Sequence, residues 1–247
     1  MEDVRGPASA LVDEIRRRVS LAQERSVPVL RRVRRELTMR MEREDPAVVT
    51  QVVKRAIAEP SVPRWLAYEL LHYHQPTMDA LTIDQLEDLG KGIGAWAEVD
   101  SFACYISGPA WREGRVSTID IRRWALSNDR WWRRAALVST VALNNTARGG
   151  IGDADRTFAI CDLLRDDRDD MVVKAMSWAL RELLGKEPRR VEAYVARHER
   201  VLAARIVREV RNKLETGLKN PNYRRAAAAG RTSTAALADP PTPPADA

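Results

Sequence analysis

Apolar residues recur along this chain at intervals of three and four, the spacing that gathers them on one face of a helix. Leu11, Ile15 and Val19 are a simple example, and they predict a helix over residues 8–24. No stretch alternates apolar and polar residues as a half-buried strand would. The same helical spacing, interrupted by proline, glycine and short polar links, predicts further helices at residues 27–43, 47–58, 62–73, 83–90, 95–107, 118–126, 130–143, 154–165, 170–185, 189–198 and 202–217.

The lengths of these helices and the short links between them predict an all-α fold. Paired antiparallel helices of this size favour an α-solenoid, in which each pair buries its apolar face on the next pair. No strict sequence repeat is visible, so this prediction depends on lengths and links alone. We expect residues 1–221 to form a single helical domain. Residues 222–247 are poor in large apolar side chains and rich in alanine and proline, which predicts a disordered tail.

The composition of the chain favours binding to anionic partners. The chain is 45% hydrophobic and 31% charged, as a folded protein is, with a net charge of +6 and a pI of about 9.6. A net positive charge favours binding to polyanions, above all nucleic acid. The alternative explanation is that the charge only keeps the protein soluble. Between Ile15 and Arg43 there are ten arginines and three glutamates, a net +7. This segment is either an arm that contacts phosphates or a solvated amphipathic face.

Several classes of site and location are not indicated. Cys104 and Cys161 lie far apart in apolar helical contexts, which excludes a cysteine-based zinc site and predicts buried, reduced thiols, as in a cytosol. His72 and His74 are two residues apart and do not share a helix face, so no metal site is expected. The acidic N-terminus and the absence of a long apolar run predict neither a secretory signal nor a membrane span. We therefore expect a bacterial-type cytoplasmic, nucleoid-associated protein.

Tryptophans share predicted helix faces with charged residues in three places. Residues three or four apart lie on the same face of a helix, so each pair would point into the same space. If the three helices line one concave surface, that surface has aromatic planes, one carboxylate and arginines, and it suits a flat, cationic ligand linked to phosphate. The pairs are Trp96 with Asp100, Trp131 with Arg134, and Trp178 with Arg181.

Structural explanations compete with each of these assignments. Tryptophan at helical spacing is usually part of a core, and this is the assignment we make for Trp65, Trp111 and Trp124. Asp100 alone could be the buried partner of an arginine. Arg181 could serve only to pair with neighbouring acids on its helix.

Two longer segments, Trp124–Ala136 and Val173–Glu182, together with Trp96-x-x-Val99-Asp100, resemble the AlkD-like DNA alkylation repair family, whose members are built from HEAT-like repeats. The three motifs occur in the family's order at comparable intervals, and the resemblance runs from about residue 92 to 215. The N-terminal part departs from it. Residues 24–27 are Glu-Arg-Ser-Val where the family has an aromatic-Gly-Ile-like turn, so no N-terminal DNA contact is carried over.

The resemblance implies a curved, basic cleft for duplex DNA and a DNA glycosylase of base excision repair. Such enzymes excise positively charged N-alkylated purines such as 7-methylguanine and 3-methyladenine. By position, the catalytic aspartate of the family falls on Asp100, its aromatic residues beside the lesion on Trp96 and Trp178, and its active-site arginine on Arg134. Further DNA contacts are expected from Arg130, Arg133, Lys174 and Arg181.

The chemistry of such a lesion is compatible with a lone carboxylate. A cationic purine is already a good leaving group, so the enzyme needs mainly to stabilise the oxocarbenium-like sugar and orient water. No lysine stands beside Asp100, which predicts a monofunctional glycosylase without Schiff-base chemistry. No metal or organic cofactor is implied, and we expect a monomer.

Two other function classes remain open from the sequence. A protein of the same architecture could bind damaged, bent or branched DNA without catalysis. A helical-repeat scaffold for other proteins would instead expect an apolar or mixed face, against which the arginine-rich segment argues.

Overall fold

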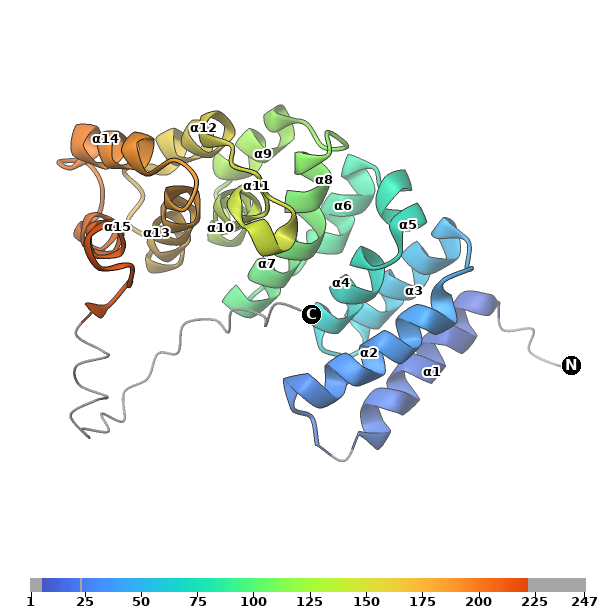
Figure 1. The fold of residues 1–247 in the computed structure, drawn as a ribbon. Helices are drawn as coiled ribbons and strands as arrows, with labels where there is room; N and C mark the ends of the chain where they lie inside the picture. Colours follow the sequence, from blue (N-terminus) through green and yellow to red (C-terminus); the bar gives the residue numbers. More distant parts are fainter. Residues whose placement is uncertain (1–5, 23, 222–247) are drawn as a thin grey trace, which may run out of the picture. The chain divides into compact units, whose positions relative to one another are not determined.

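The computed structural model describes residues 6–22 and 24–221, and every regular element in those ranges is a helix (Figure 1). This confirms the predicted all-α class. The chain divides into two compact units, one ending at Ser117 and the other beginning at Thr118. The predicted tail at 222–247 lies outside the described residues.

The first unit is organised around α4 (Arg64–His72), which packs against helices before and after it in the chain. Its neighbours are α2, α3, α5, α7 and the π-helical segment η1. The other elements of this unit are α1 (Pro7–Leu21), α2 (Val27–Met41), α3 (Pro46–Ala58), α5 (Gln75–Ala80), α6 (Ile83–Gly90), α7 (Trp96–Phe102), η1 (Ala103–Ser107) and α8 (Gly108–Arg112).

The second unit is organised in the same way around α13 (Asp170–Leu184), its longest helix. Here α13 packs against α10, α11, α12, α14 and α15. The remaining elements are α9 (Thr118–Ala125), α10 (Arg130–Ser139), α11 (Val141–Asn144), the 3-10 turn η2 (Thr146–Arg148), α12 (Ala154–Leu164), α14 (Pro188–His198) and α15 (Ala204–Thr216).

Helices pack on the corresponding helix of the next pair as well as on their chain neighbours. In the first unit α1 lies on α3 and α2 on α4; in the second, α13 lies on α15. This stacking of pair on pair is the packing expected of an α-solenoid. The predicted architecture is therefore confirmed within each unit.

Side chains at the helix starts explain why the helices begin where they do. Proline occupies the first turn of α1, α2 and α3, where its missing N–H is not needed. Asp129, Asp153 and Asp169 accept hydrogen bonds from the first backbone N–H groups of α10, α12 and α13.

The structure corrects two of the predicted helices and adds one. The expected helix 95–107 is α7 followed by the π-helical η1, and the helical path continues through α8 to Arg112. The expected helix 130–143 is divided into α10 and α11 at Thr140. The short α5 was not predicted; Pro76 follows the end of α4 closely and lies in the first turn of this additional helix.

The core assignments are mostly confirmed. Trp111 and Trp124 are buried, and so are Cys104 and Cys161. Trp65 is an exception, since it is only half-buried and lies 6.0 Å from the guanidinium carbon of Arg31. Across the described ranges, no helix combines the length and apolarity needed to cross a membrane.

Candidate functional site

Trp96 and Asp100 lie on the short helix α7 of the first unit. The turn before it includes Gly92, whose φ of 70° is favourable only for glycine, and Gly94, whose N–H donates to the Glu98 carboxylate at 3.0 Å. Trp96 is the first residue of α7 and is 39% exposed, while Asp100, one turn later, is 7% exposed. By helix geometry the two side chains lie one turn apart, the indole at the surface and the carboxylate largely buried.

The segment after Asp100 departs from α-helical geometry. Gly108 N–H donates to the Ala103 carbonyl, five residues back, as in a π-helix. Pro109 has no N–H for its α-helical partner, the Tyr105 carbonyl. His72 supplies a donor instead, because its Nδ1 lies 2.7 Å from that carbonyl oxygen. Since a carbonyl only accepts, Nδ1 of His72 holds the proton, and this histidine supports the helix that bears Asp100.

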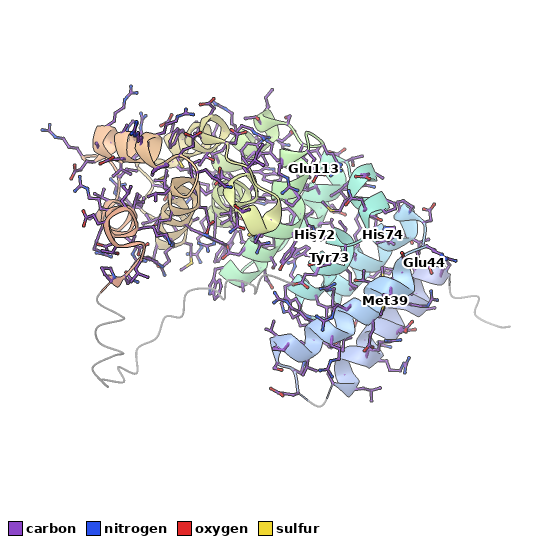
Figure 2. All side chains as sticks on the ribbon, in the orientation of Figure 1. Met39, Glu44, His72, Tyr73, His74 and Glu113 are labelled. Carbon is purple, nitrogen blue, oxygen red and sulfur yellow. The ribbon has the colours of Figure 1, made fainter. Side chains whose placement is uncertain are left out.

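Glu69 of α4 is a buried acid that fixes α2 against α4. The residue is 1% exposed, and its carboxylate accepts hydrogen bonds from Arg34 Nε at 3.1 Å and from Arg31 Nε at 3.3 Å. The Arg34 guanidinium also lies 4.0 Å from the ring centroid of Tyr73, an exposed side chain just after α4. Figure 2 labels Tyr73 beside His72 at this end of α4. Two arginines of the basic segment between Ile15 and Arg43, Arg31 and Arg34, therefore stabilise the packing of α2 on α4.

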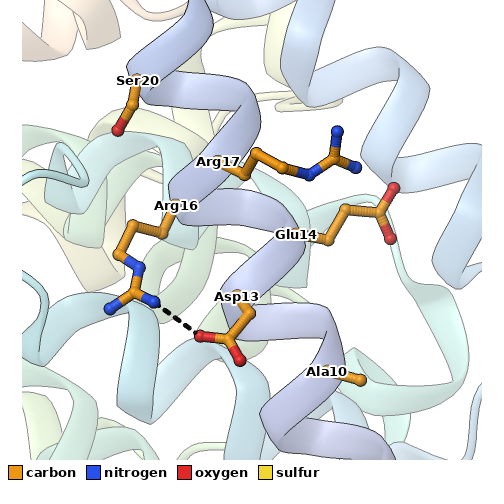
Figure 3. A pocket seen from close by; sticks show the side chains of 6 residues that line it. All are labelled: Ala10, Asp13, Glu14, Arg16, Arg17 and Ser20. Carbon is orange, nitrogen blue, oxygen red and sulfur yellow. Dashed lines mark hydrogen bonds and ion pairs between the residues drawn. The ribbon is translucent and has the colours of Figure 1, made fainter.

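Other arginines of the basic segment are paired on its surface. A shallow hollow on α1 is lined by acidic and basic side chains together, and Arg16 donates to Asp13 there at 2.9 Å (Figure 3). Arg18 meets Glu14 at 2.7 Å and Glu36 at 2.8 Å. Part of the local positive charge is thus balanced by acids, which favours the solvated-face interpretation for these positions.

In the second unit, Arg134 connects α10 to the start of α13. Its side chain is buried, with the residue 4% exposed, and Nη1 donates to the Met171 carbonyl at 2.6 Å. The bond fixes the direction of the guanidinium. The pKa of the Asp170 carboxyl, at the start of α13, is lowered mainly by a hydrogen bond from Lys174, and Arg134 adds a smaller contribution.

The two other arginines predicted on α10 have different surroundings. Arg133 donates to Asp167 at 2.8 Å and to the carbonyls of Ser127 and Asn128 at 3.0 and 2.9 Å, so it holds the loop before α10. Arg130 is exposed: it lies 4.8 Å from the Trp131 ring centroid and 3.6 Å from the Asp169 carboxylate.

Lys174 and Arg181 lie on α13 among acidic partners. Lys174 Nζ lies 2.6 Å from the Asp170 carboxylate and is the main cause of the lowered pKa of that group. Arg181 Nε donates to Ser177 Oγ at 3.3 Å, and Ser177 in turn donates to Glu209 of α15 at 2.6 Å.

Trp178 is half-buried on α13, and its indole is held by an acid one turn later. Its Nε1 donates to Glu182 Oε1 at 2.9 Å, and Glu182 Oε2 accepts from Asn145 Nδ2 at 3.0 Å. Glu182 and Asn145 were not among the predicted site residues. The four-residue spacing of Trp178 and Glu182 was a visible signal, whereas the contact to Asn145 required the fold.

The model of one protein family matches residues 25–214, a range that includes every candidate site residue. That family is described as DNA alkylation repair enzyme. The chain belongs to this family. The match reaches further toward the N-terminus than the motif resemblance, which began near residue 92. A comparison with curated protein sequences gives no match. Family membership indicates an enzyme that takes part in the repair of alkylated DNA and interacts with DNA.

Proposed function

We propose that this protein is a monofunctional DNA glycosylase that excises positively charged N-alkylated purines such as 7-methylguanine and 3-methyladenine. The observation that carries the proposal is the pair on α7, a carboxylate that is 7% exposed one turn from an indole that is 39% exposed, in a chain of a family that repairs alkylated DNA. Water screens such a carboxylate weakly, so its charge acts strongly on a neighbouring cation.

The proposed reaction is hydrolysis of the bond between the base nitrogen and C1′. The bonding electrons leave with the purine, which departs neutral because it began with a positive charge. Positive charge then develops on the sugar, and Asp100 stabilises it. Water attacks C1′ and loses a proton to solvent, with Asp100 orienting the water. Trp96 offers an aromatic face to a cationic base, an attraction of roughly 0.5–2 kcal/mol.

Each unit contributes its own residues to the proposal. In the second unit, Trp178 supplies another aromatic face, and Arg134 binds a phosphate with a guanidinium already oriented by the Met171 carbonyl. Arg130, Lys174 and Arg181 are further phosphate contacts. We expect a smaller contribution from Arg133, because its donors hold the loop before α10.

The test measures release of free base from a duplex containing one 7-methylguanine. We expect Asp100→Asn to slow release by at least about 100-fold, the cost typical of losing one preorganised electrostatic contact, while DNA affinity changes little. Asp84→Asn is the matched control, since Asp84 is an exposed aspartate in the same unit. We expect it to behave as wild type.

Two outcomes would overturn the proposal in different ways. Release at the wild-type rate by Asp100→Asn would remove the catalytic role of Asp100. No release by wild type, with tight and salt-sensitive binding to duplex DNA, would identify a DNA-binding protein without glycosylase activity.

A further inference from the structure

The side chain of Glu182 bridges Trp178 and the loop that follows α11. One carboxylate oxygen accepts from the indole N–H at 2.9 Å, and the other accepts from the Asn145 amide at 3.0 Å. We infer that Glu182 is a positioning residue, which fixes the plane of the Trp178 ring and makes that ring a better partner for a cationic base. This inference rests on the proposed function.

Asn145, at the other end of this hydrogen-bonded bridge, is itself held by backbone hydrogen bonds. Asn145 N–H donates to the Val141 carbonyl at 2.8 Å, and the Asn145 carbonyl accepts from Gly150 N–H at 2.9 Å. The backbone at Gly150 approaches so closely that an added Cβ would lie 2.7 Å from Leu143 carbonyl atoms. These backbone hydrogen bonds and the close packing at Gly150 therefore hold Asn145 in a rigid loop.

The neighbouring Asn144 secures the same loop to α12. Its buried amide donates to the Thr140 carbonyl at 3.0 Å and to Thr157 Oγ1 at 2.9 Å, and its oxygen accepts from Asp153 N–H at 2.9 Å. A buried amide with three such partners resists displacement. The position of the Glu182 carboxylate is thus determined from α11, α12 and α13 together.

A fixed indole matters for two physical reasons. A half-buried tryptophan can turn about two side-chain bonds, and stacking on a base needs one particular plane, so restriction before binding removes an entropic cost. The negative charge at the N–H also polarises the ring toward higher electron density, which strengthens its attraction for a cation. A neutral acceptor would still fix the plane of the indole ring, but it would polarise the ring less than the carboxylate does.

Variants at Glu182 and Asn145 separate these effects. Glu182→Ala removes the bridge, whereas Glu182→Gln keeps an acceptor for the indole. Among the described residues, the side-chain oxygen of Asn145 has no hydrogen-bond partner, so this amide can turn over and accept from the glutamine. Asn145→Ala removes only the hydrogen bond from the Asn145 amide to Glu182. Glu192→Ala is the matched control, because Glu192 is an exposed glutamate on α14.

The first readout is the 15N-labelled indole N–H signal of Trp178, assigned by its loss in Trp178→Phe. In wild type we expect a hydrogen-bonded shift and slow exchange with solvent. Both should be lost in Glu182→Ala, reduced in Asn145→Ala, and largely kept in Glu182→Gln and Glu192→Ala. An unchanged signal in Glu182→Ala would overturn the inference, whether or not the protein releases base.

The second readout is the rate of 7-methylguanine release at saturating enzyme, compared with DNA affinity. We expect Glu182→Ala to slow release about tenfold, which corresponds to about 1.4 kcal/mol, with less than a threefold change in affinity. Glu182→Gln should recover most of the loss. Equal losses in Glu182→Ala and Glu192→Ala would overturn the inference by assigning the effect to net charge. Absence of release in wild type would refute the proposed function while leaving the indole signal as the test of positioning.

Discussion

The buried Glu69 cluster gives a sharp test of the energetics of the first unit. Glu69→Gln keeps the size of the side chain and its ability to accept hydrogen bonds but removes its charge. Glu69 is 1% exposed and Arg34 is 5% exposed, so Arg34 would lose its counter-ion in a place where water cannot replace it. Breaking a buried pair by removing one partner's charge costs about 3–5 kcal/mol.

Hydrogen exchange measured by mass spectrometry is the appropriate assay, because it reports on each unit separately. A loss of 3–5 kcal/mol should speed exchange of the best-protected amides in α2 and α4 by roughly two to three and a half orders of magnitude. Amides of α13 and α15, in the other unit, should keep their rates.

Glu36→Gln is the matched control. Glu36 pairs with Arg18 at 2.8 Å, but these side chains are 49% and 30% exposed, so the pair contributes about 0–1 kcal/mol. The reasoning would be refuted if Glu69→Gln changed exchange in α2 and α4 no more than Glu36→Gln does. Equal acceleration in both units would also refute it.

Two further predictions concern the loop after α11 and acid stability. Gly150→Ala should destabilise the second unit by about 1–3 kcal/mol, as overpacking does, because the new methyl group would lie 2.7 Å from the Leu143 carbonyl. Thermal unfolding measures this loss of stability, and an unchanged unfolding temperature would contradict the close packing. Hydrogen bonds from Lys54 and Lys91 lower the pKa of Asp88 from 3.8 to about 2, so its stabilising contribution is present above about pH 4 and is lost as the pH falls toward 2. Asp88→Asn should therefore be less stable than wild type at neutral pH, with the difference vanishing near pH 2 in acid-unfolding curves; a constant difference would argue against the lysine contacts.

Local periodicity was enough to predict most helices, because each helix signals itself through its own apolar face. It missed the short α5, where Pro76 lies in the first turn. It also missed the continuation through α8, where the π-helical η1 and a hydrogen bond from His72 compensate for the missing N–H of Pro109. These compensations come from residues that are distant in sequence.

The candidate site shows the same division between local and long-range information. The common face of Trp96 and Asp100 follows from their spacing alone. The surroundings of Arg133 do not, because its acidic partner Asp167 lies 34 residues later. The Trp65 assignment failed for a similar reason, since a tryptophan at helical spacing gives no sign that an arginine of another helix covers it.

The π-helical segment also bears on how related sequences should be compared with this one. An extra residue in an α-helix rotates everything after it by about 100°. A π turn absorbs such a residue locally, so Asp100 on α7 keeps its orientation while Trp111 on α8 remains 1% exposed. A relative with an unbroken α-helix here would be one residue shorter between these two positions. Alignments of the family should therefore allow a single-residue gap between Asp100 and Trp111, and this gap would record a change in helix type with no loss of structure.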